Sequence, residues 1–210
     1  MIVTAIIWNI FYYRGVQSEK VHEFQLIVMF QPLLTIILAA LFLKGEQNFT
    51  IIAASLVASI ALIASHINKQ HLEFSRGSWY LIWAVIFMSI ELIISKVLLE
   101  VISPVAFYFV RTGILTVFFM IFYHPNLERV ANTNALLIFA TSLMGVIQMI
   151  TKYYGFQQLG VVYTSLILML APILVYAVST IWMHERLKIR TVLSAAVILI
   201  CVIYATMFAS

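Results

Sequence analysis

The sequence contains no aspartate, only one cysteine and few charged residues. The lack of aspartate excludes aspartate-based catalytic dyads and calcium loops of the EF-hand type. Cys201 alone can form neither an internal disulfide nor a cysteine metal cluster. Charged residues make up 10% of the chain and apolar residues 64%, against about 25% and about 45–50% in soluble domains. A soluble domain could not cover so much apolar surface, so the composition predicts a protein that lies in a lipid bilayer.

Motifs for several other functions are also missing. The net charge is +4, but lysine and arginine form no stripe, which argues against a nucleic-acid partner. No phosphate-binding glycine loop or nucleophile elbow occurs. His184-Glu185 begins like a zinc-protease motif, but Lys188 stands where the second histidine ligand would be. We therefore expect no enzymatic activity, no cofactor and no bound metal.

Long apolar runs alternate with short polar breaks along the whole chain. In lipid each backbone polar group must be satisfied within its own segment, so these runs are helices rather than strands. The first run is shorter than the about 20 residues that a full span needs, and we interpret it as the second half of a helix. The sequence thus predicts an all-α transmembrane bundle of about eight spans, at 1–13, 21–43, 50–67, 78–97, 103–123, 133–152, 158–183 and 190–209.

Two parts of the sequence resemble each other. Each has a proline in an apolar helix, then a short loop with a glutamate, then a second apolar run. Pro32 pairs with Pro172, and Glu46 pairs with Glu185 after a gap of one residue. An odd number of predicted helices separates the two glutamate loops, so the loops lie on opposite faces of the membrane and the units are inverted copies. Secondary transporters are typically built from inverted repeats, with the solute site near the midplane between the halves.

This repeated pattern resembles the EamA domain of the drug/metabolite transporter superfamily. The stretch with Ser95-Lys96, Ser103-Pro104 and Phe109-Val110-Arg111 is similar to the opening helix pair of that domain. Family members usually have ten helices in two five-helix repeats. The resemblance covers nearly the whole chain and implies that the first two helices of the family pattern are absent. It divides the chain into a partial first repeat at 1–67, a connecting loop at 68–77 and a complete second repeat at 78–209.

These features predict a secondary transporter that moves a small metabolite or drug-like solute by alternating access. We expect it in the plasma or inner membrane of the cell, where its partners are the bilayer and the solute. The alternative is a non-transporting subunit or an inactive truncated remnant, because two helices of the family pattern are absent. A homodimer is one alternative for the oligomeric state.

Polar groups inside lipid are costly, so they mark candidate binding residues. Glu91 lies about six residues before the end of its span and Arg111 about eight residues into the next, so both lie roughly 9–12 Å from the same helix ends. A buried ion pair fits this geometry; the alternative is that Arg111 extends to the headgroups while Glu91 faces another helix or water. The full set of candidate substrate-binding residues is Gln25, Gln31, Glu91, Arg111, Gln148, Tyr163 and Tyr176.

Four further residues are expected to shape the fold. Pro32 and Pro172 each free a backbone carbonyl four residues earlier, which serves either a solute or the shape of the helix. Glu46 and Glu185 precede helices, where a carboxylate interacts favourably with the positive end of the helix dipole. Near the predicted span end at Lys152, we expect the adjacent pair Tyr153-Tyr154 to anchor the membrane interface.

Two arguments about membrane orientation disagree. Basic residues gather in the loops of one side, Arg14, Lys20, Lys69, Arg76, Arg129, Arg186, Lys188 and Arg190, against Lys44, Lys96 and Lys152 on the other. The charge count places the 184–190 loop in the cytoplasm and the C-terminus outside, whereas the family resemblance implies the reverse. We give the charge count more weight. In a chain with Cys201 replaced, a single cysteine at Lys188 should then resist an impermeant maleimide added to intact cells; labelling from outside would favour the resemblance.

Overall fold

A computed structural model describes residues 1–18, 24, 27–66, 75–124, 132–171, 174 and 189–208. Within these ranges all regular structure is helical, as the sequence predicted. The helices are α1 Ile2–Ser18, α3 Phe30–Phe42, the 3₁₀ turn η1 Lys44–Glu46, α4 Phe49–His66, α5 Arg76–Leu99, α6 Pro104–Tyr123, α7 Asn132–Leu159, α8 Val161–Leu168 and α10 Ile189–Phe208.

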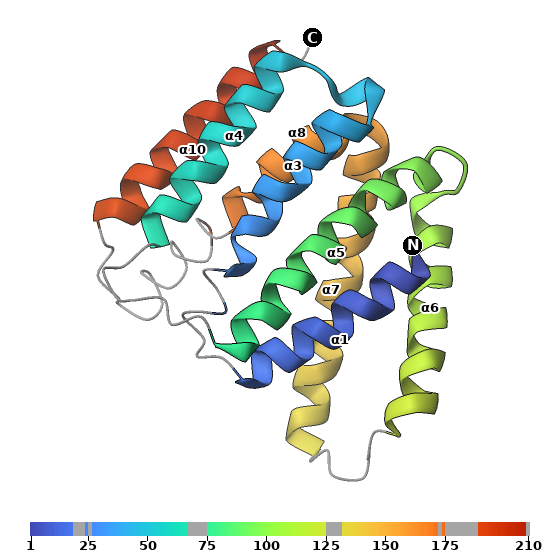
Figure 1. The fold of residues 1–210 in the computed structure, drawn as a ribbon. Coiled ribbons are helices and arrows are strands. Elements are labelled where there is room, and N and C mark those ends of the chain that lie inside the picture. The colour runs from blue at the N-terminus through green and yellow to red at the C-terminus, as the bar shows by residue number, and fades with distance from the viewer. Residues whose placement is uncertain are drawn as a thin grey trace.

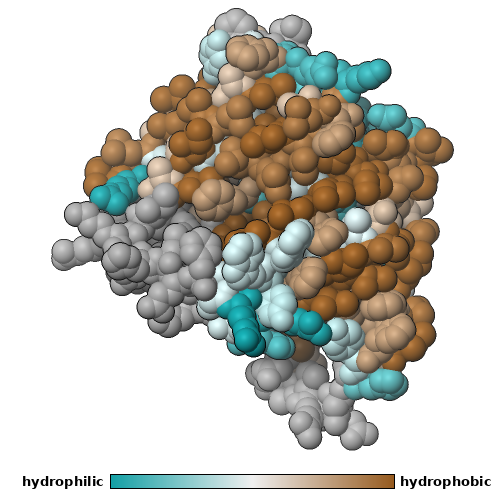
Figure 2. All heavy atoms as spheres, viewed as in Figure 1, coloured by the Kyte–Doolittle hydropathy of each residue, from teal (hydrophilic) through white to brown (hydrophobic). Residues whose placement is uncertain are grey.

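Three of these helices are long and apolar enough to cross a membrane, at Arg76–Leu99, Pro104–Tyr123 and Ala135–Gln158. Shorter apolar helices lie at Phe30–Phe42, Phe49–Ser65 and Val192–Met207. The outside of the bundle is also apolar, and Figure 2 shows hydrophobic residues over most of the viewed face. Phe42 and Met207, for example, are about 70% exposed (71% and 70%). In a bilayer such side chains contact lipid tails, which are as apolar as leucine.

Two predicted helix ends are wrong. Helix α1 continues through Ser18 rather than ending at residue 13, and α7 continues through Leu159 rather than ending at residue 152. Hydropathy marks where a chain leaves lipid, but a helix persists wherever its own i to i−4 hydrogen bonds remain satisfied. α7 ends only before Gly160, because the φ of +86° at Gly160 lies outside the helical region.

Helices from distant parts of the chain lie side by side in Figure 1: α4 packs along α10, α3 packs on α8, and α1 lies on α5. Small residues make these contacts close. Ala54, Ser55, Ala58 and Ser59 are buried on α4. On α1, a Cβ added to Gly15 would lie 2.4 Å from the Leu81 side chain of α5, so any other residue there would force Leu81 to move.

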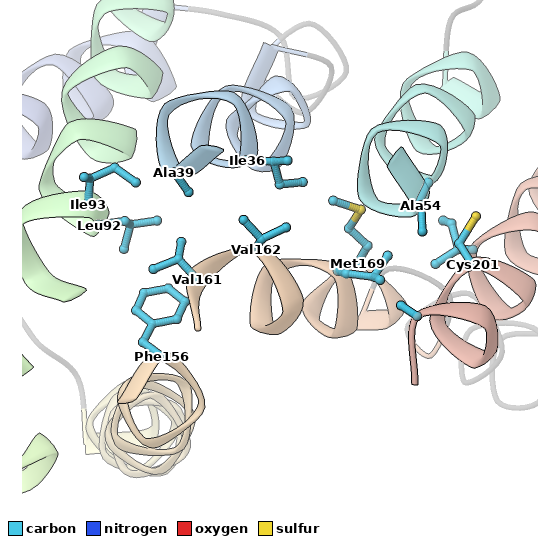
Figure 3. Close-up of a cluster of buried hydrophobic side chains, with 14 of the residues drawn as sticks. Ile36, Ala39, Ala54, Leu92, Ile93, Phe156, Val161, Val162, Met169 and Cys201 are labelled. Atoms are coloured by element: carbon cyan, nitrogen blue, oxygen red, sulfur yellow. The ribbon is translucent and has the colours of Figure 1, made fainter. Parts of the chain in front are cut away.

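The core is an apolar cluster at the centre of the bundle. In Figure 3, Ile36 and Ala39 of α3 face Val162 of α8, and Phe156 of α7 lies beside Val161. All five side chains are at most 2% exposed. The cluster therefore closes the middle of the bundle between α3, α7 and α8.

The helix pairing agrees with the proposed inverted repeat. The pairs α3–α8 and α4–α10 join corresponding helices of the two units, as a twofold axis requires. Pro32 lies in the first turn of α3, just after a break in the helix at Met29. There the absent N–H of a proline costs no helical hydrogen bond. Pro172 lies outside the described residues, so the division into two repeats stays a prediction.

Candidate functional site

The buried ion pair predicted from the sequence is present. Glu91 of α5 and Arg111 of α6 meet with 2.5 Å between Oε1 and Nε. The two residues are 2% and 6% exposed. The chain turns back on itself in the short connection that ends at Ser103 and Pro104. As a result, α5 and α6 are antiparallel and place both side chains at the same depth in the bundle. No second ion pair forms among the residues that the structure describes.

A third helix joins this pair. The indole nitrogen of Trp8, on α1, donates a 2.6 Å hydrogen bond to Oε2 of Glu91. Both carboxylate oxygens of Glu91 are thus engaged, one by each partner. Trp8 was not among the binding residues predicted from the sequence. A buried indole N–H normally needs an acceptor, which is the one signal in the sequence that could have drawn attention to it.

Arg111 uses only part of its hydrogen-bonding capacity. Its Nε donates to Glu91, while its two terminal amino groups have no hydrogen-bond partner among the described residues. A guanidinium normally binds a carboxylate through two parallel N–H groups. The two terminal amino groups of Arg111, which could bind both oxygens of a carboxylate, are therefore not used by Glu91.

Lys152 of α7 directly precedes Tyr153, whose ring packs against Phe107, one helical turn before Arg111 on α6. We call Glu91, Arg111 and Lys152 the central charged cluster. The Lys152 ammonium lies 5.4 Å from the centre of the Phe156 ring, and no carboxylate of the described chain pairs with it. With one acidic and two basic groups, the cluster carries a formal charge of +1.

Lys152 and Tyr153 lie deeper in the bundle than the sequence predicted. Because α7 continues to Leu159, Lys152 lies about 10 Å inside the helix end rather than at it. Tyr153 is 1% exposed and packs edge-on against Phe107, with 4.9 Å between the ring centres. It is therefore a core residue and not an interface anchor. Tyr154, on the other side of the helix, is 45% exposed.

A polar cleft of about 480 Å³ opens at one end of the bundle. It lies where η1 and the ends of α5 and α7 meet the start of α8. Tyr163, one of the predicted binding residues, lines it. Its other polar lining residues are Lys44, Glu46, Asn48, Lys96, Glu100, Gln157 and Gln158.

Glu46 has a structural role in this cleft, but at a different helix from the one predicted. Its carboxylate accepts hydrogen bonds from the backbone amides of Val161 at 2.5 Å and Val162 at 2.9 Å. It therefore caps α8 rather than α4, the helix that follows it in sequence. The amides at the start of α4 are bound instead by the side chain of Asn48. A carboxylate at this position also complements the positive end of the α8 dipole.

The remaining predicted residues are dispersed. The Gln31 side chain donates to Thr35, whose hydroxyl lies 3.2 Å from that of Ser89, so Gln31 belongs to a polar contact between α3 and α5. Gln148 is exposed on α7 and does not line the cleft. Four of the predicted residues lie outside the described part of the chain, namely Gln25, Pro172, Tyr176 and Glu185.

Residues 75–207 match the sequence model of the EamA-like transporter family. Among curated proteins nothing matches. One solved crystal structure of a protein is similar to this chain in fold, with a TM-score of 0.78. The two chains are 17% identical, and the likeness covers 99% of this chain and 74% of the other. At this identity the likeness extends to the fold alone.

Proposed function

Since this chain belongs to the EamA-like transporter family and is an integral membrane protein, we propose that it carries a small metabolite or drug-like solute across the bilayer by alternating access. In this mechanism the solute site faces one side of the membrane and then the other, as the two repeats rock around it. Charged groups inside the bundle, such as Glu91 and Arg111, are typical of substrate pathways in membrane proteins.

The observation that carries the proposal is a cleft open at one end of the bundle and closed by packing further in. The cleft is lined together by residues 42–46, 48 and 51 of the first repeat and by residues 157–160, 162 and 163 of the second. One and two turns further along α3, Ala39 and Ile36 belong to the apolar core cluster. This arrangement fits a transporter in a state that opens to one side only.

Opening the other side would require α3 and α8 to separate at the apolar cluster. The contact between Ile36 and Val162 is apolar on both sides, so separation breaks no hydrogen bond between these side chains. The α3–α8 contact is therefore a suitable gate. At the open end, Glu46 connects η1 to α8 through hydrogen bonds to the backbone amides of α8.

Cysteine accessibility tests this mechanism. In the full chain with Cys201→Ser, reconstituted in vesicles, Gln158→Cys should react with an impermeant maleimide from the cleft side. Ile36→Cys, at a fully buried position, should react from the opposite side. Ile102→Cys and His124→Cys, in exposed connections at the two ends of α6, report which end faces outward.

Vesicle uptake of a panel of radiolabelled amino acids, organic acids and nucleobases accompanies the labelling. A transported solute should change the labelling rate at Ile36→Cys. If no panel member enters and Ile36→Cys stays unlabelled from both sides, the chain is better described as a non-transporting subunit.

A further inference from the structure

We propose that Arg111 and Lys152 form the binding site for a singly charged anionic group of the solute, a carboxylate. The inference rests on the proposed transport function and names the class of solute that the protein would carry. Its basis is the unbalanced charge of the central cluster, together with hydrogen-bond donors that no group of the described chain satisfies.

The cluster contains more positive than negative charge. Glu91 compensates only one of the two cations, and both of its oxygens are already bound, by Arg111 and by Trp8. Lys152 forms no ion pair with a carboxylate of the described residues, and its ammonium lies over the Phe156 ring. A ring face attracts a cation much more weakly than a carboxylate does. An anion at this position would therefore remove an unfavourable charge from a low-dielectric region.

The hydrogen-bond donors of the cluster suit a carboxylate. The two terminal amino groups of Arg111 are not used by any described residue, and they form a planar fork that matches both oxygens of a carboxylate. Lys152 adds a third donor that can rotate towards the same group. Lys152 is half-buried, while Glu91 and Arg111 are almost completely buried, so Lys152 is the most accessible member of the cluster.

The +1 charge of the central charged cluster determines which solute charge it can neutralise. A monoanion brings the cluster from +1 to zero. A dianion would leave one uncompensated negative charge, and a neutral solute would leave the positive charge in place. Because each uncompensated charge is costly in the bundle interior, a monocarboxylate fits better than sulfate, phosphate or an amide.

Binding to the purified full chain in detergent tests the inference without requiring transport. The probes are acetate, benzoate and nicotinate, each compared with its neutral amide, and sulfate. At least one carboxylate should raise the melting temperature or change tryptophan fluorescence, since Trp8 contacts the cluster directly. Its amide and sulfate should do so only at concentrations on the order of tenfold higher, as expected for losing a charged hydrogen bond.

Two variants assign the effect to this site. Lys152→Gln should weaken carboxylate binding by a similar factor, and Lys152→Glu should abolish it and favour benzamidine, a cation of the same shape as benzoate. Arg14→Gln is the matched control, because Arg14 also lies over an aromatic ring, that of Tyr80 at 6.0 Å, but is exposed and distant from the cluster. It should leave carboxylate binding unchanged.

The inference is overturned if no carboxylate differs from its amide in the unmodified chain, if sulfate binds as tightly, or if Lys152→Gln binds as well as Arg14→Gln. These outcomes are separate from the proposed function. If benzoate binds at Lys152 but Ile36→Cys is never labelled, the anion site is supported and alternating access is not. If Ile36→Cys is labelled from the opposite side but benzoate and benzamide bind equally well, alternating access is supported and only the anion site is refuted.

Discussion

Replacing Glu91 by glutamine is expected to destabilise the protein by about 3–5 kcal/mol, the usual effect of breaking a buried ion pair by removing one partner. The glutamine amide can still accept a hydrogen bond from Trp8 or Arg111. It cannot neutralise the Arg111 guanidinium, which is 6% exposed and has no other carboxylate within reach among the described residues. Thermal or denaturant unfolding of the purified protein in detergent measures the effect.

Glu100→Gln is the control for this substitution. Glu100 is an exposed carboxylate at the C-terminal end of the same helix, so its neutralisation should change the free energy of unfolding by no more than about 0.5 kcal/mol. The double variant Glu91→Gln, Arg111→Met removes both charges and should recover most of the loss, because an apolar pair needs no compensation. Equal stability of Glu91→Gln and Glu100→Gln would show that the pair contributes nothing.

The ion pair could be predicted because charged residues inside membrane spans are few. Glu91 and Arg111 lie at matching depth on consecutive antiparallel helices, so each has few other partners in reach. The spans themselves were predictable for the same reason, since apolar runs of this length have no soluble alternative. In both cases the lipid environment removes the competing arrangements.

Contacts between distant helices could not be predicted in this way. Trp8 reaches Glu91 across 83 residues of sequence, and Glu46 reaches Val161 across 115. Both depend on how α1 lies on α5 and how η1 lies on α8, which the polarity of the sequence does not encode. Lys152 was misplaced because its polar surroundings suggested a loop, whereas the backbone remains helical up to Gly160.

Gly160→Ala is expected to destabilise the protein by about 2–4 kcal/mol, for two reasons that act together. With φ of +86° and ψ of 168°, Gly160 has a backbone conformation that is almost restricted to glycine. An alanine Cβ there would also lie 2.6 Å and 2.7 Å from the two carboxylate oxygens of Glu46. Glu46 must then move, and the amides of Val161 and Val162 lose their acceptor.

Gly45→Ala is the matched control for this last substitution. Gly45 lies in η1 beside Glu46, but a Cβ added to it meets no atom within 4 Å, so its effect should stay within about 0.5 kcal/mol. If the collision with Glu46 contributes, adding Glu46→Ala to Gly160→Ala should cost less than Glu46→Ala costs in the unmodified chain, since the cap is already lost. Unfolding of the four variants in detergent decides between these outcomes. Strictly additive effects would mean that Gly160 acts only through its backbone conformation, and equal stability of Gly160→Ala and Gly45→Ala would refute both causes.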